Sequence, residues 1–231
     1  PEAGMQLLWD RKHLHADTWL NWQSYIFKED SHQEAFTVGA SWRVTPGKIS
    51  KRLRWNIPIQ MVIQHRGGEQ DTTTMGVQTI ANAATGVGLD WIPVRSKVLT
   101  KLFAEANVLL TYQQSGHLWP FDNGIAYHVT VGSTLWKHLS LRAGYFKAPE
   151  HFVSLYGNHF FSTLSARDNV SHMGIATTYA HIEYSHVFAR RYALGAEGEI
   201  FQSTMPHRNE SNFSFGVYLR VNPSIIIKRW Q

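Results

Sequence analysis

Residues 54 to 66 read RWNIPIQMVIQHR, and this stretch decides the fold class of the chain. Every second residue is apolar, and this set consists of Trp55, Ile57, Ile59, Met61 and Ile63. The residues between them are mostly polar, and they are Asn56, Pro58, Gln60, Val62 and Gln64. Successive side chains of a β-strand point to opposite faces, so this alternation predicts a strand with one apolar face.

Working outward from this strand, the same alternation recurs in about ten segments. The others lie at 12–28, 34–44, 75–91, 101–113, 125–135, 139–145, 174–188, 192–200 and 213–221. A soluble sheet of this kind needs a second layer to cover its apolar face, and no segment has that character. The predicted fold is all-β, an antiparallel up-and-down transmembrane β-barrel of about ten strands, within a range of roughly eight to twelve.

Length and composition favour one domain. The 231 residues are predicted to form a single barrel, and residues 1–11 either extend the first strand or form a periplasmic N-terminal extension. Only 17% of the residues are charged whereas 13% are aromatic, which is unusual for a soluble surface. A bundle of membrane helices would need several apolar runs of roughly 20 residues, and the sequence has none.

The predicted connections alternate in length and charge. Short ones lie at 45–48, 92–97, 136–138 and 189–191, and they are basic, whereas the longer ones between them are acidic. Short turns are typical of the periplasmic side and long loops of the extracellular side, which predicts an integral protein of the bacterial outer membrane. With ten strands, both chain ends would be periplasmic. The basic end would lie beside lipid headgroups, so the net charge of +5 indicates membrane and not nucleic acid.

Four tryptophans fall where predicted strands meet the short turns, namely Trp42, Trp55, Trp91 and Trp136. Aromatic belts of this kind are expected at membrane interfaces. On this pattern, and not on a motif, nearly the whole chain resembles a bacterial outer-membrane β-barrel. The resemblance implies contact with phospholipid and lipopolysaccharide, and other outer-membrane proteins or lipoproteins as further partners. No specific family is identified.

The alternation assigns side chains to two environments. The predicted lipid-facing set is Trp55, Ile57, Ile59, Met61, Ile63, Val108, Leu110, Phe213, Phe215 and Val217. The predicted charged network in the lumen is His15, Asp17, Glu105, Arg142, His181, Glu183, Glu197, Glu199 and Arg220. In this network Arg220 is expected to lie between the carboxylates of the neighbouring strand and, across the barrel closure, Asp17.

A non-enzymatic role is favoured, as a structural or accessory subunit of a larger outer-membrane complex or as a plugged scaffold. A small porin-like channel for polar solutes is the first alternative, and a lipid-modifying hydrolase of the outer membrane is the second. No catalytic residue is predicted, because Ser185 and Glu183 alternate away from His186 on one strand. No metal site and no cofactor are predicted. His13 with His15, and His181 with His186, are spaced as pairs but lack a convincing set of further ligands. A soluble ligand-binding barrel would show the reverse arrangement, with apolar residues inside.

Overall fold

The computed structural model describes residues 3–25, 27, 30–68, 74, 76–155, 159–165, 169–188, 192–205 and 208–221. These residues form strands and one short 3-10 helix, η1 (His159–Phe161). The strands are β1 (Ala3–Arg11), β2 (Leu14–Ser24), β3 (Ala35–Lys48), β4 (Leu53–Arg66), β5 (Gln78–Trp91), β6 (Leu99–Ser115), β7 (Asn123–Leu135), β8 (Leu139–Lys147), β9 (Ala176–Phe188), β10 (Tyr192–Met205) and β11 (Arg208–Val221). No helix in these ranges is long and apolar enough to cross a membrane.

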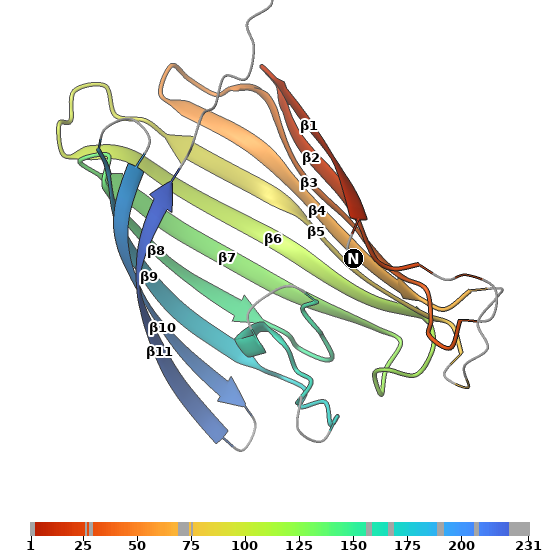
Figure 1. Cartoon of the computed structure of the whole chain (residues 1–231). Coiled ribbons are helices and arrows are strands. Elements are labelled where there is room, and N and C mark those ends of the chain that lie inside the picture. The colour runs from red at the N-terminus through yellow and green to blue at the C-terminus, as the bar shows by residue number, and fades with distance from the viewer. Residues whose placement is uncertain are drawn as a thin grey trace, which may run out of the picture.

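All the strands belong to one sheet, in which each strand pairs with the next along the chain (Figure 1). Every pairing is antiparallel, and the sheet contains eleven strands in the order of the sequence. The prediction of an all-β, antiparallel, up-and-down arrangement is therefore confirmed. The sheet is open, because β1 and β11 are its two edges and do not pair with each other in the described part of the chain.

Two predicted boundaries are wrong, and the first of them accounts for the extra strand. Residues 3–11 are a strand of their own, because the chain reverses at Lys12 and His13 and pairs Arg11 with Leu14. The predicted strands 192–200 and 213–221 end and begin too early at their shared connection, since β10 and β11 stay paired as far as Met205 and Arg208. A polar stretch can pair as well as an apolar one, because the backbone supplies the hydrogen bonds of a sheet.

The odd number of strands changes the positions of the chain ends. Successive strands run in opposite directions, so β1 and β11 run in the same direction and Ala3 and Val221 lie at opposite ends of the strands. The expectation that both ends lie on one side does not hold, because it depended on a count of ten. Direct pairing of the two edges would be parallel.

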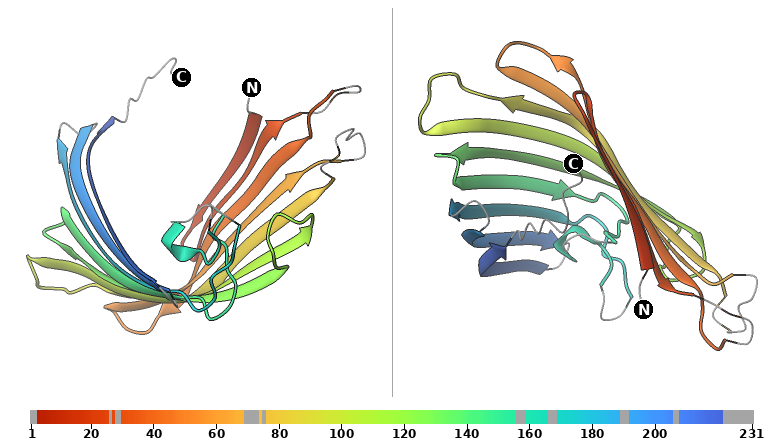
Figure 2. Two further views of the ribbon diagram at one scale, coloured as in Figure 1. Left: turned by 90° about the horizontal axis from the view of Figure 1, so that it is seen from below. Right: turned by 45° about the horizontal axis from the view of Figure 1, so that its top comes forward.

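The sheet is strongly curved, and it bends around the connection between β8 and β9 (Figure 2). We call the side that holds this connection the concave face and the other side the convex face. Phe152, Phe160 and Thr163 of the connection are buried against the concave face. One core cluster joins Phe152 to Ala126, Phe146 and Ala148, and another joins Val153 to Ile80 and Trp119.

The convex face carries the apolar members of the alternating pattern. The predicted lipid-facing residues all lie on this side, and the most exposed are Phe213 at 82%, Phe215 at 75% and Val217 at 66%. They do not converge on a common core. The same face has an open apolar groove of about 960 Å³, lined in part by Leu89, Leu102 and Ile182. No second layer of described residues covers this surface.

Candidate functional site

A polar cavity of about 550 Å³ lies on the concave face. It is lined by side chains from seven neighbouring strands, β3 to β9, and the polar ones include Arg43, Asn56, Glu105, Asn107, His128, Thr130, Arg142 and Tyr179. Each takes the alternate position to the exposed apolar residues of its strand. The pleat therefore gathers on one face polar groups that are scattered along the sequence.

His128, Thr130 and Tyr179 form a hydrogen-bonded triangle in this cavity. The Nε2 atom of His128 lies 3.2 Å from the Thr130 hydroxyl and 3.0 Å from the Tyr179 hydroxyl. The two hydroxyl oxygens are 2.8 Å apart. An imidazole beside a buried aliphatic hydroxyl is the usual pairing of a general base with an oxygen nucleophile.

A glycine on β8, the strand between β7 and β9, allows this triangle to form. Thr130 of β7, Gly144 of β8 and Tyr179 of β9 are successive partners in the sheet. The Tyr179 ring lies over Gly144, where an added Cβ would be 2.4 Å from the ring. The phenol hydroxyl can therefore cross β8 and reach Thr130.

Charged and amide side chains surround the triangle. Arg43 donates to Glu105 at 3.2 Å and also to Asn56, while the Asn107 amide donates to the other oxygen of Glu105 at 2.8 Å. Thr130 is the sheet partner of Glu105, and His128 is the partner of Asn107. Arg142 lines the same cavity and supplies a positive charge. Such a setting can stabilise an oxyanion that forms near Thr130.

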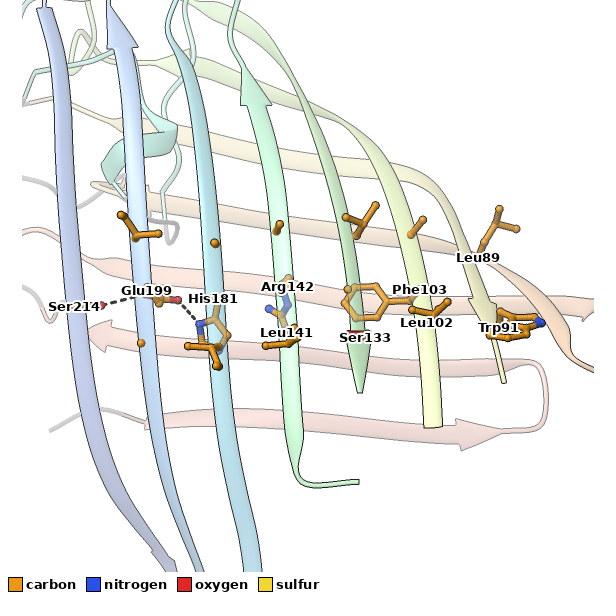
Figure 3. Close-up of a pocket in the computed structure, with 18 of the residues that line it drawn as sticks. Leu89, Trp91, Leu102, Phe103, Ser133, Leu141, Arg142, His181, Glu199 and Ser214 are labelled. Carbon is orange, nitrogen blue, oxygen red and sulfur yellow. Dashed lines mark hydrogen bonds and ion pairs between the residues drawn. The ribbon is translucent and has the colours of Figure 1, made fainter. Parts of the chain in front are cut away.

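A second imidazole, that of His181, lies on the same face of β9, two residues after Tyr179. His181 Nδ1 is 2.7 Å from a carboxylate oxygen of Glu199, and Ser214 donates to the other oxygen at 3.5 Å. Figure 3 shows these three residues on the adjacent strands β9, β10 and β11. This contact orients the histidine ring, and Nε2 is the ring nitrogen that does not contact the carboxylate. Arg142 is the sheet partner of His181, so the two imidazoles belong to one continuous polar strip.

The components of a hydrolytic triad are thus divided between two places. His128 has hydroxyl neighbours but no carboxylate in hydrogen-bond contact among the described residues, whereas His181 has a carboxylate but no hydroxyl. Ser185 and Glu183 share the concave face, and His186 lies on the opposite face as the alternation predicts. The described residues contain no group of three or more His, Cys, Asp or Glu side chains that could hold a metal ion.

The structure divides the predicted lumen network into separate contacts. His181 meets Glu199, Glu105 meets Arg43, and the Tyr218 hydroxyl donates to Glu183. At the other edge, Asp17 accepts from Gln6 at 2.9 Å, and His15 lies 3.9 Å from Asp10.

Arg220 is not brought to its expected partners. It stacks over the Tyr218 ring at 5.6 Å, and no ion pair joins it to Glu197, Glu199 or Asp17 within the described ranges. β1 takes the edge position that the prediction gave to the strand of Asp17, which places Asp17 one strand further from β11.

Sequence reasoning missed the triangle. His128 and Thr130 are two residues apart on a predicted strand, so their shared face could have been read from the alternation. Tyr179 had no such signal, because its approach depends on the pairing of β8 with β9 and on Gly144. The predicted lumen network contained only ionisable residues, so the neutral hydroxyl of Thr130 was not included.

A family model described as "Lipid A 3'-O-deacylase-type" matches residues 1–230 of the chain. No curated protein matches the chain, and no solved structure matches it. The prediction of a non-enzymatic structural role is wrong, because the matching family is named for a lipid-modifying hydrolase. The comparison gives no support to a porin-like channel or to a subunit of a membrane complex. It agrees with the second alternative and with an outer-membrane setting.

Proposed function

Because the chain belongs to the lipid A 3'-O-deacylase-type family, we propose that it hydrolyses an ester-linked acyl chain of lipid A in the bacterial outer membrane. The single observation that carries the assignment to a site is the contact of His128 Nε2 with the Thr130 hydroxyl at 3.2 Å. The hydroxyl is buried, and it faces the polar cavity that Arg142 also lines.

The proposed reaction begins with attack by Thr130 Oγ1 on the ester carbonyl carbon while His128 Nε2 takes the hydroxyl proton. Tyr179 donates a hydrogen bond to the developing oxyanion, and Arg142 adds positive charge nearby. Collapse of the intermediate breaks the ester bond, and His128 returns the proton to the sugar hydroxyl that leaves. A water molecule activated by His128 then releases the fatty acid from Thr130.

A second candidate uses the same face without a covalent step. The 2.7 Å contact of His181 with Glu199 favours an imidazole that activates water directly. In that case Thr130 would only position the substrate. The two candidates differ in which hydroxyl or water attacks the carbonyl carbon, and an acyl-enzyme forms in only one of them.

We also propose that the chain forms one barrel domain, with its convex face in lipid and its concave face as the lumen. The long rows of exposed apolar side chains, up to 82% exposed at Phe213, support contact of the convex face with acyl chains. In this proposal the predicted lipid-facing set contacts acyl chains, and the charged residues of the predicted network line the lumen. The short turns would be periplasmic and the longer connections extracellular.

The test is release of fatty acid from lipopolysaccharide in detergent micelles, followed by mass spectrometry of the lipid A. Thr130→Val removes the hydroxyl and is expected to lower kcat by roughly 10²- to 10⁴-fold, whereas Thr130→Ser keeps a nucleophile and retains activity. Thr178→Val on the convex face is the matched control. A folded wild-type protein that releases no fatty acid would exclude the hydrolase.

Two further variants separate the candidates. If Thr130 is the nucleophile, His128→Asn abolishes turnover because acylation itself needs this base, and an acyl adduct on Thr130 is trapped when the wild-type reaction is quenched. If water is activated by the second imidazole, His181→Asn and Glu199→Gln have the larger effect and no adduct forms. Wild-type activity of Thr130→Val would rule out the covalent route.

A further inference from the structure

An apolar pocket of about 290 Å³ lies on the concave face beside the polar cavity. We call it the acyl pocket, and its walls include Trp19, Gln60, Val62, Ala84, Leu109 and Phe152. Eight of its twelve lining residues are apolar, and the polar ones are Ser41, Gln60, Asn82 and Ser154. The lumen face therefore changes in character within a short distance, from arginines and carboxylates to aliphatic and aromatic groups.

A small residue in each of two rows of paired strands shapes the pocket. In the first row Trp19, Gly39 and Val62 are successive partners, and the Trp19 indole lies over Gly39, where an added Cβ would be 2.2 Å from the ring. In the second row Gln60, Ala84 and Leu109 are partners. The indole thus fills the space over Gly39 and forms a wall of the pocket, whereas Ala84 lies between the larger Gln60 and Leu109 and leaves a trough that a longer side chain would fill.

The connection between β8 and β9 closes the pocket from above. The Asn82 amide donates to the Val153 carbonyl at 2.8 Å, and its oxygen accepts from the Leu155 amide at 2.7 Å. Phe152 is 1% exposed and packs in the same cluster as Leu109. The roof is thus fixed to the sheet by paired hydrogen bonds and by core packing.

The acyl pocket and the polar cavity adjoin each other. Gln60 lines both of them. On β6, Leu109 of the pocket and Asn107 of the cavity are two residues apart on one face, about 7 Å along the strand. Asn107 is the sheet partner of His128, so an ester held at Thr130 would lie within a few carbon atoms of the pocket.

We propose that the acyl pocket holds the fatty acyl chain of the substrate and sets which chain lengths are cleaved. This inference rests on the proposed hydrolase function and adds a specificity site to it. Hydrocarbon fits the aliphatic and aromatic walls, and the size of the trough limits the chain. The pocket is on the concave face, so the bound chain lies inside the proposed lumen. It points toward the end of the sheet that carries the longer connections.

The test compares chain-length profiles on a series of soluble acyl esters, from acetate to long chains. Ala84→Leu fills the trough and is expected to lower kcat/KM for long-chain esters by about tenfold or more while leaving short-chain esters unchanged. Val62→Ala enlarges the trough and shifts the preference to longer chains. Ala106→Leu, at an exposed position on the convex face of β6, is the matched control.

The outcomes separate this inference from the function on which it rests. If the wild type cleaves esters and both pocket variants keep its chain-length profile, the acyl pocket is rejected and the hydrolase remains. Equal loss on all chain lengths in Ala84→Leu, with no shift in Val62→Ala, also rejects it.

A binding measurement makes the inference independent of turnover. A fatty acid brominated on its chain is expected to quench tryptophan fluorescence on binding, and part of the quenching is lost in Trp19→Phe. Quenching that depends on Trp19 in a protein without esterase activity supports the pocket and rejects the hydrolase. Quenching that is identical in Trp19→Phe places the chain elsewhere.

Discussion

At the scale of single residues, the site depends on the absence of a side chain at Gly144 on β8. Tyr179 reaches Thr130 across β8 because residue 144 is a glycine, and the hydroxyl groups of the two residues end 2.8 Å apart. The same arrangement places the Trp19 indole over Gly39. A large ring over a glycine on the next strand thus determines both the reactive cluster and the acyl pocket.

Gly144→Ala is expected to disrupt the cluster. The added Cβ would meet the Tyr179 ring at 2.4 Å, so the ring must move away from Thr130, at a cost of about 1–3 kcal/mol in the free energy of unfolding. The matched control is Gly198→Ala on β10, where the nearest atom would be 3.5 Å from the added Cβ. Urea unfolding and esterase assays of the two variants measure the difference, and equal behaviour would contradict this account.

At the scale of elements, the connection between β8 and β9 covers the concave face, and Trp119 of the connection between β6 and β7 packs beside it. The β8–β9 connection is held by Asn82 and by contacts of Phe146 with Phe152 and Phe161. Phe161 also lies against His128, with ring centroids 5.5 Å apart. The connection therefore forms a wall of the reactive cluster as well as the roof of the acyl pocket.

Asn82→Ala is expected to loosen this connection. It removes two hydrogen bonds to the backbone of Val153 and Leu155 and leaves those groups without a partner, which costs about 1–3 kcal/mol. Limited proteolysis should then cut the connection faster, and hydrolysis should slow. Asn123→Ala at an exposed strand end is the control. Unchanged proteolysis in Asn82→Ala would show that packing alone holds the connection.

At the scale of the whole molecule, the curved sheet has one concave polar face and one uncovered apolar face. The exposed apolar side chains of β11, such as Phe213 and Phe215, alternate with polar residues such as Asn212 and Ser214 on the other side. This division is expected if the convex face contacts lipid, as we propose, because lipid offers no hydrogen bonds to polar side chains.

Phe215→Arg places a charge on the convex face and is expected to reduce insertion into liposomes, at a cost of roughly 2–4 kcal/mol near the bilayer midplane. Asn212→Arg changes the concave face of the same strand and should insert almost normally. Insertion is measured by the fraction of protein that resists protease in vesicles. Equal insertion of the two variants would contradict the assignment of the convex face to lipid.

The sequence by itself determined the strands and their two faces, because the period of two is a local property of the backbone and appears wherever apolar and polar residues alternate. It could not give the count of eleven, since the reversal at Lys12 and His13 depends on pairing between strands. Nor could it bring Tyr179 to Thr130 or Phe152 over Leu109. Those contacts join residues that are far apart in the chain, and only the register of the sheet and the path of the β8–β9 connection placed them together.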